Sequence, residues 1–147
     1  PNTESIWRGL ARAHSESAQY AEAREAAERA VELAPEVADG WTMLGTVLAG
    51  ALEPEKARDA FAKALQLKPL QPRVLLSMGH VEKTIGDSTA SEIAYDEAFR
   101  IDPSLGEAMW SKADLKTYRF RPEEIEAMNR QLGKDISNTS DVAAFHF

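Results

Sequence analysis

The sequence predicts an all-α fold, an α-solenoid in which antiparallel helix pairs stack one after another. Three observations support this prediction. Residues of matching size recur every 34 positions over most of the 147-residue chain, and a proline recurs at the end of each period. Within a period, the apolar residues follow the i, i+3, i+4, i+7 spacing of amphipathic helices. A single pair of such helices leaves apolar surface exposed, so the pairs must stack to bury a continuous core.

Seven columns of residues keep the 34-residue register through three units. A large residue in the first helix and the Leu or Met three positions later fill the space between the paired helices. The small residue that follows lets the second helix approach closely. A proline ends each unit, because it lacks a backbone N–H and clashes with the preceding turn. The columns are Trp7, Trp41 and Leu75; Leu10, Leu44 and Met78; Ala11, Gly45 and Gly79; Ala23, Ala57 and Ser91; Ala27, Phe61 and Tyr95; Ala30, Ala64 and Ala98; and Pro35, Pro69 and Pro103.

This pattern resembles the tetratricopeptide repeat over residues 4–105. The three units are 4–37, 38–71 and 72–105. The resemblance implies a curved solenoid in which the first helix of each unit lines a concave groove. His14 and Glu82 depart from the repeat, because they stand where an aromatic residue is common. Pro54 replaces an apolar residue early in a second helix, where the first turn has no hydrogen bond to lose.

Placing the sequence on the repeat puts nine residues on or near the concave groove. They are Arg8, Arg12, Thr42, Met43, Thr46, Arg73, Leu76, His80 and Lys83. Four of these side chains are cationic within an acidic chain. The groove is therefore expected to attract an extended acidic peptide through charge-assisted hydrogen bonds. The alternative is that these residues are solvated or contact another part of the same protein.

Chaperone-binding tetratricopeptide proteins clamp a C-terminal carboxylate with a set of Lys and Asn residues, and this set is not present here. Arg8 occupies one clamp position, whereas Arg12 stands where the Asn would be. We therefore do not expect a co-chaperone of the Hsp90 or Hsp70 type.

The register weakens after residue 105, where we predict a divergent or capping helix pair over 106–133. Lys112 stands in the column of core Leu and Met residues, and Trp110 comes one residue late relative to Trp41. We expect helices at 107–118 and 121–132. Their apolar sides are Met109, Trp110, Ala113 and Tyr118 in the first helix, and Ile125, Met128 and Leu132 in the second. Residues 134–147 are interpreted as a loop followed by the start of a truncated helix.

A narrower resemblance lies in this divergent stretch. The segment GEAMWSKADLKTYRF, followed by EEIEAM, is similar to the stretch that closes the tetratricopeptide region of bacterial tetratricopeptide-repeat sulfotransferases. AAFHF at 143–147 resembles the start of a later helix of that family, and Lys112 departs from its usual apolar residue. The matching residues are Trp110, Ala113, Asp114, Leu115, Lys116, Thr117, Tyr118 and Phe120. The alternative is a diverged capping repeat with a polar outer face.

The sulfotransferase resemblance implies a parent protein that uses 3′-phosphoadenosine 5′-phosphosulfate. The donor-binding loop and the catalytic base of that family are absent from this sequence. The chain is then interpreted as a non-catalytic arm that recognises the acceptor or docks on the enzyme's own catalytic domain. The other class of function is a stand-alone scaffold or adaptor that binds a peptide or protein in the groove.

Composition and motifs argue against several other classes. The formal charge of −7 argues against general nucleic-acid binding, the lack of cysteine excludes thiolate metal sites, and no stretch is as apolar as a membrane span. There is no phosphate-binding glycine loop and no nucleophile elbow, and His14, His80 and His146 are far apart. We expect a cytoplasmic protein, with no catalytic residue, metal or cofactor in this chain, whose partner is a protein or peptide.

Overall fold

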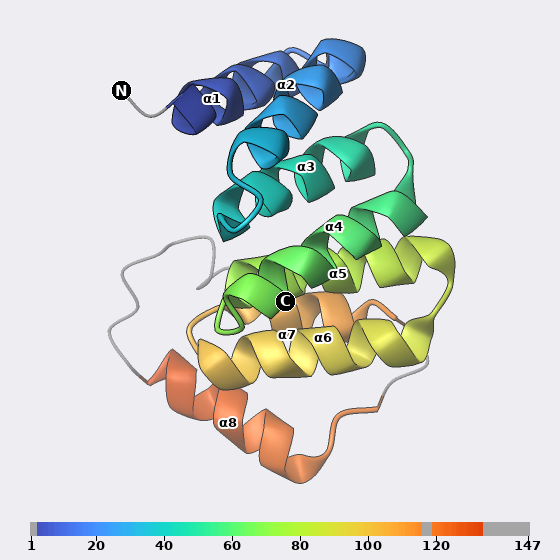
Figure 1. The fold of residues 1–147 in the computed structure, drawn as a ribbon. Helices are drawn as coiled ribbons and strands as arrows, with labels where there is room; N and C mark the ends of the chain where they lie inside the picture. The colour runs from blue at the N-terminus through green and yellow to red at the C-terminus, as the bar shows by residue number, and fades with distance from the viewer. Residues whose placement is uncertain (1–2, 116–118, 134–147) are drawn as a thin grey trace.

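A computed structural model describes residues 3–115 and 119–133, and these residues are entirely helical apart from their turns. The eight helices of these residues are α1 (Thr3–Glu16), α2 (Tyr20–Leu33), α3 (Ala38–Gly50), α4 (Pro54–Leu67), α5 (Pro72–Ile85), α6 (Ser88–Ile101), α7 (Gly106–Ala113) and α8 (Pro122–Leu132) (Figure 1). The predictions for Tyr118, for the loop and truncated helix at 134–147 and for the AAFHF segment concern residues outside the described ranges. No described helix is long and apolar enough to cross a bilayer.

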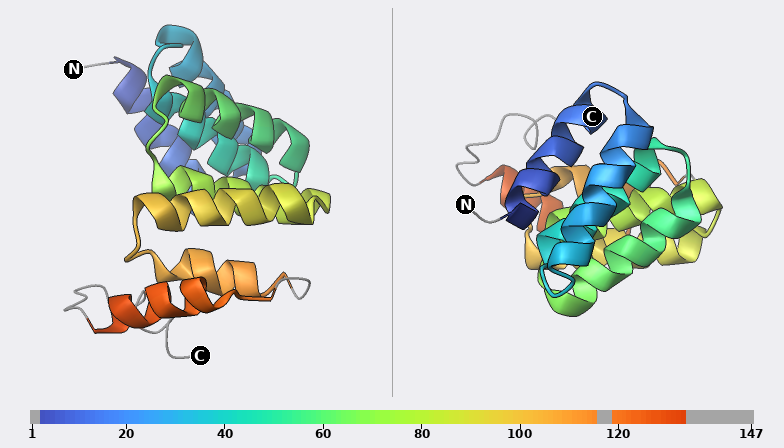
Figure 2. Two further views of the ribbon diagram at one scale, coloured as in Figure 1. Left: turned by 90° about the horizontal axis from the view of Figure 1, so that it is seen from below. Right: turned by 45° about the horizontal axis from the view of Figure 1, so that its top comes forward.

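The helices form antiparallel pairs that stack in chain order. α1 packs on α2, α3 on α4 and α5 on α6, and the second helix of each pair also contacts the first helix of the next. α7 and α8 continue the stack beyond α6 (Figures 1 and 2). The predicted all-α solenoid is therefore confirmed. α2, α4 and α6 each end two residues before a column proline, as the inability of proline to continue a helix requires.

Close approach within each pair depends on a matched small and large residue. In the first pair Ala11 and Ala27 are both fully buried. In the second pair the facing residue is Phe61, and a Cβ placed on Gly45 would lie 2.7 Å from its ring. The third pair repeats this arrangement with Gly79 and Tyr95. An aromatic residue in the second helix therefore requires glycine in the first.

The turn inside each pair contains a residue in the left-handed backbone region. Ala18, Leu52 and Gly86 have φ values of 56°, 61° and 98°. These three positions are 34 residues apart, so the backbone repeats even where the side chain does not. Only Gly86 has the residue type that adopts this conformation without steric strain.

One core prediction for the first pair is wrong. Leu10 was expected to fill the space between the paired helices, but it is 42% exposed, and Ile6 one turn earlier is 58% exposed. In the second pair the same positions are Gly40 and Leu44, and both are buried. The difference arises because α2 covers that face of α3, whereas no described helix covers the corresponding face of α1.

The divergent region keeps the 34-residue register for longer than its sequence suggests. Met109 falls in the column of Trp7 and is 2% exposed, whereas Trp110 is 46% exposed and does not belong to the predicted apolar side. α7 ends at Ala113 rather than at residue 118. α8 contains no fully buried residue.

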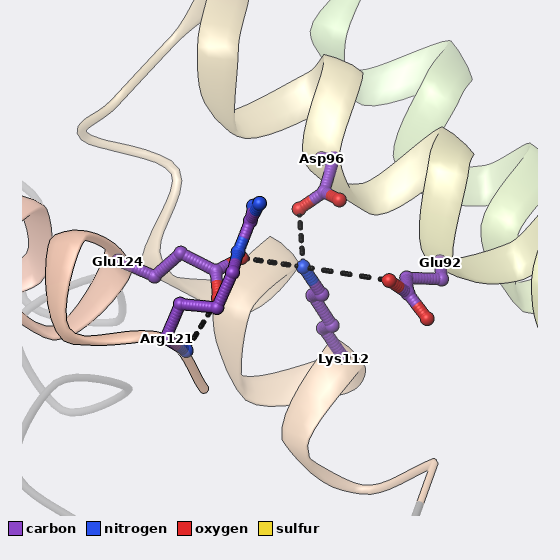
Figure 3. A network of polar contacts seen from close by, with 5 residues as sticks. All are labelled: Glu92, Asp96, Lys112, Arg121 and Glu124. Carbon is purple, nitrogen blue, oxygen red and sulfur yellow. Dashed lines mark hydrogen bonds and ion pairs between the residues drawn. The ribbon is translucent and has the colours of Figure 1, made fainter. Parts of the chain in front are cut away.

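Lys112 is completely buried in the column of core Leu and Met residues. Its Nζ lies 2.6 Å from Asp96 Oδ1 on α6, 2.7 Å from Glu124 Oε1 on α8 and 4.0 Å from Glu92 Oε1 on α6 (Figure 3). The Glu124 carboxylate also accepts a 2.8 Å hydrogen bond from the backbone N–H of Arg121, which caps α8. The lysine therefore joins α6, α7 and α8 by polar contacts where earlier units use apolar packing.

Candidate functional site

The first helices of the pairs lie next to one another, because α1 contacts α3 and α3 contacts α5. Two hollows open along this row of first helices. We call the row with its two hollows the groove. The hollows differ in chemistry, and each contains residues that the sequence analysis placed on the groove.

A polar hollow of about 190 Å³ lies between α1 and α3. It is lined by Ser5, Arg8, Gly9, Arg12 and Met43. Arg8 is already paired, since its Nε lies 3.0 Å from Glu4 Oε1 and its Nη1 lies 3.2 Å from Asp39 Oδ2. Arg12 is 70% exposed, and the nearest carboxylate oxygen among the described residues, in Glu16, is 4.0 Å away. Arg12 is therefore the cation of this hollow that is better able to meet a ligand.

An apolar hollow of about 360 Å³ lies between α3, α4 and α5. Its lining residues are Thr46, Ala49, Leu52, Pro54, Phe61, Ser77, His80, Val81 and Thr84. The three hydroxyl groups donate to carbonyl oxygens of their own helices, at 2.9 Å for Thr46, 3.1 Å for Ser77 and 2.9 Å for Thr84. Because these donors are satisfied internally, the hollow mainly offers carbon atoms to a ligand.

Among the described residues that line the apolar hollow, His80 alone carries an ionisable group. Its Nε2 lies 3.1 Å from Ser111 Oγ, and its ring packs edge-on against Tyr95 with centroids 5.5 Å apart. Burial lowers the pKa of the His80 imidazole, against a smaller opposing effect of the Glu107 carboxylate. The ring is therefore neutral near neutral pH, which suits an uncharged ligand group.

The structure brings five of the nine predicted groove residues into the two hollows. Thr42 lies half-buried on α3 and donates its hydroxyl to the Ala38 carbonyl at 3.1 Å. Arg73 lies at the start of α5 and has no ion pair within the described residues. Residues in the hollows are Arg8, Arg12, Met43, Thr46 and His80.

Two further predicted groove residues line neither hollow. Leu76 is only 6% exposed and packs in a core cluster with Tyr95 and Leu105, because α7 covers this side of α5. Lys83 is exposed, but its Nζ lies 2.5 Å from Asp114 Oδ2. With Arg8 also paired, two of the four predicted cations are neutralised by acidic residues of the next first helix or of its end.

Sequence reasoning missed Ser77 and Thr84 of the apolar hollow, although both could have been found by spacing. They lie three residues before and four residues after His80, so they share its face of α5. Phe61 was assigned to the core alone, whereas it also forms part of the wall of the hollow.

The geometry described so far defines a repeat protein built from stacked helix pairs. Two family matches, each described as a tetratricopeptide repeat, cover residues 8–72 and 72–105. The chain therefore belongs to the tetratricopeptide repeat family. A search of the curated proteins finds no match.

Several solved structures share the fold. The first TPR domain of Spaghetti (RPAP3) bound to the HSP90 peptide SRMEEVD superposes with a TM-score of 0.75 at 11% identity, covering 78% of this chain and 91% of that one. A MamA protein matches at 0.74 and 21% identity, covering 90% and 73%. TTC0263, a TPR protein of Thermus thermophilus, matches at 0.74 and 17% identity, covering 99% and 81%. At these identities the likeness concerns the fold alone.

Proposed function

We propose that this chain is a non-catalytic protein-interaction module whose groove binds a peptide segment of a partner protein. The observation that carries the proposal is that the apolar hollow of about 360 Å³ lies next to the polar hollow. Met43, which lines the polar hollow, and Thr46, which lines the apolar hollow, are one turn apart on α3. An extended peptide could place an apolar side chain near His80 and an acidic group near Arg12. Arginine is well suited to a carboxylate because it can donate two parallel hydrogen bonds.

The groove is expected to attract acidic peptides less strongly than four unpaired cations would. Arg8 and Lys83 are paired with Asp39 and Asp114, so Arg12 and Arg73 supply the available positive charge. The HSP90 peptide of the Spaghetti complex combines acidic and apolar residues, as the proposed ligand does. The Lys and Asn clamp is not present in this sequence, so we propose a different peptide partner.

Binding of capped peptides in which glutamate and leucine alternate tests this function. Arg12→Ser is expected to weaken binding by about tenfold, the effect of losing one charge-assisted hydrogen bond. Thr46→Trp should weaken it as well by filling the apolar hollow. Fluorescence anisotropy with a labelled peptide measures both effects.

Arg29→Ser is the matched control for this experiment. Arg29 lies on α2, outside the groove hollows, and is paired with Glu32. The substitution removes the same charge and should change the affinity by less than about twofold. Equal binding by the Arg12, Thr46 and Arg29 variants would contradict the proposed site.

The second proposal concerns the parent protein and rests on the sequence resemblance of residues 106–120. We propose that the chain serves as the acceptor-recognition or docking arm of a sulfotransferase that uses 3′-phosphoadenosine 5′-phosphosulfate. None of the matches described above is a sulfotransferase. Calorimetric titration of the full-length gene product with 3′-phosphoadenosine 5′-phosphate tests this role, and the present chain is the control. Absence of binding by the full-length product would contradict the sulfotransferase role and favour a stand-alone scaffold.

A further inference from the structure

A third hollow, of about 290 Å³, lies between α4, α5 and α6, outside the groove. We call it the α4–α6 hollow. It is reached from a different face of α5, which presents Leu75, Met78 and Glu82 here but Ser77, His80 and Thr84 to the groove. Its lining residues are Leu65, Leu75, Met78, Glu82, Ala90, Ile93, Ala94 and Glu97.

Glu82 is a buried carboxylate without a partner in this apolar surrounding. The residue is 6% exposed, and within the described part of the chain its side chain makes no hydrogen bond or ion pair. In the preceding pair, the same column holds Leu48, which is 4% exposed. Burial removes part of the hydration of this side chain and no protein donor replaces it, while the carboxylate oxygens themselves are not completely buried.

The walls of the α4–α6 hollow are also particular to the third pair. Ile93 is 65% exposed, whereas the same column holds the acidic residues Glu25 and Asp59 in the first two pairs. Leu75 stands in the column of Trp7 and Trp41, and its smaller side chain leaves more space. The third pair therefore combines an exposed apolar side chain, Ile93, with a buried carboxylate, Glu82. Neither residue is of the kind expected for packing the helix pair.

We propose that the α4–α6 hollow binds a segment of a partner protein that carries an Arg or Lys next to a large apolar side chain. An ionised carboxylate can only accept hydrogen bonds, so the group that satisfies Glu82 must be a donor, and a cation also offsets the charge. The aliphatic stem of Arg or Lys would cover the apolar walls, and the neighbouring apolar side chain would cover Ile93.

The other carboxylate of the hollow is less suited to this role. Glu97 is bonded to Arg100 on the same helix, with distances of 2.8 Å to Nε and 2.5 Å to Nη2. Glu82 is thus the acceptor that remains without a partner. The ligand of this hollow has the opposite charge to the ligand proposed for the groove, so the two surfaces can be tested separately.

The probe is the capped tripeptide acetyl-Leu-Arg-Leu-amide, compared with the same peptide carrying citrulline, a neutral isostere of arginine. Methyl NMR on the whole chain, titrated with each peptide into the millimolar range, reports the site and the affinity. We expect the arginine peptide to shift the methyl signals of Leu75, Met78 and Ile93 and to bind at least about tenfold more tightly than the citrulline peptide.

Glu82→Leu gives a second readout, because it restores the residue type of Leu48. We expect it to reduce the affinity for the arginine peptide to that of the citrulline peptide, and to raise the denaturant midpoint of the free protein. Glu25→Gln removes one negative charge from an exposed site of α2 and should leave the affinity within about twofold. Arg12→Ser in the groove should also leave it unchanged.

Three results would overturn the proposal. Equal affinities for the arginine and citrulline peptides would show that Glu82 does not recognise a cation. Retained binding by the Glu82→Leu variant would place the peptide elsewhere. Loss of binding in Arg12→Ser would place it in the groove.

Discussion

Replacement of Lys112 by methionine is expected to lower the free energy of unfolding by about 3 kcal/mol and to detach α8 from the stack. The substitution removes the Lys112 cation from Glu124, which is 13% exposed and keeps only the exposed Arg121 guanidinium at 3.4 Å. Asp96 and Glu92 keep access to water at 41% and 38% exposure. The expected loss is therefore at the lower end of the range for breaking a buried ion pair. Met78 occupies the same column in the third unit, so a methionine at position 112 should pack well, and lost packing should contribute little to the loss of stability.

Two measurements check the Lys112→Met variant. Chemical denaturation gives the stability, and amide hydrogen exchange over residues 122–132 reports the docking of α8. Lys83→Met is the matched control, because Lys83 also contacts a carboxylate of the next helix end at 2.5 Å but is 40% exposed. The control should lose less than about 1 kcal/mol. Unchanged exchange in α8 of the Lys112 variant would show that the lysine does not hold this helix.

Gly79→Ala is expected to lower the free energy of unfolding by about 3 kcal/mol. An added Cβ would lie 2.4 Å from Tyr95 Cε1 and 2.6 Å from Cδ1. The tyrosine is fully buried, so its ring cannot turn into solvent and α5 must move away from α6. Urea denaturation measures the loss, with the dependence of the unfolding free energy on urea concentration compared between the variant and the unsubstituted chain.

The same chemical change at Gly9 provides the control. A Cβ on Gly9 has no neighbour within 4 Å, so alanine should stabilise α1 by up to about 1 kcal/mol through its higher helix propensity. A second control is Gly79→Ala in a Tyr95→Ala background, which recreates the pairing of Ala11 with Ala27. The cost of the glycine substitution should then disappear. If it persists, the clash with the ring is not the cause.

The 34-residue columns predicted the fold and most of the core because helix pairs that repeat in sequence must repeat in packing. Ala23, Ala57 and Ser91 are all fully buried, as that column requires. The columns could not predict that Lys112 would remain buried in its column, since this depends on carboxylates from two other helices. The burial of Leu76 could not be predicted for a similar reason, because the covering helix α7 lies beyond the regular repeat.

The electrostatics of the groove could have been predicted more fully. Arg8 pairs with Asp39 and Lys83 with Asp114, and the partners are separated by 31 residues in both cases. This separation is one helical turn less than the repeat, so it joins neighbouring first helices. The sequence shows an acidic residue 31 positions after Arg8 and after Lys83, so both pairs could have been predicted. The hollows themselves could not be predicted, because their volumes depend on how far the stacked helices separate.

No described helix covers the face of α1 that carries Ile6 and Leu10. Ile6 and Leu10 occupy positions that α2 buries in the following pair. In a nearest-neighbour description of folding, α1 therefore contributes one stacking interface where α3 and α5 contribute two. Among the described helices, thermodynamic coupling is therefore weaker for α1 than for α3 or α5, and melting α1 alone leaves every other interface between these helices in place.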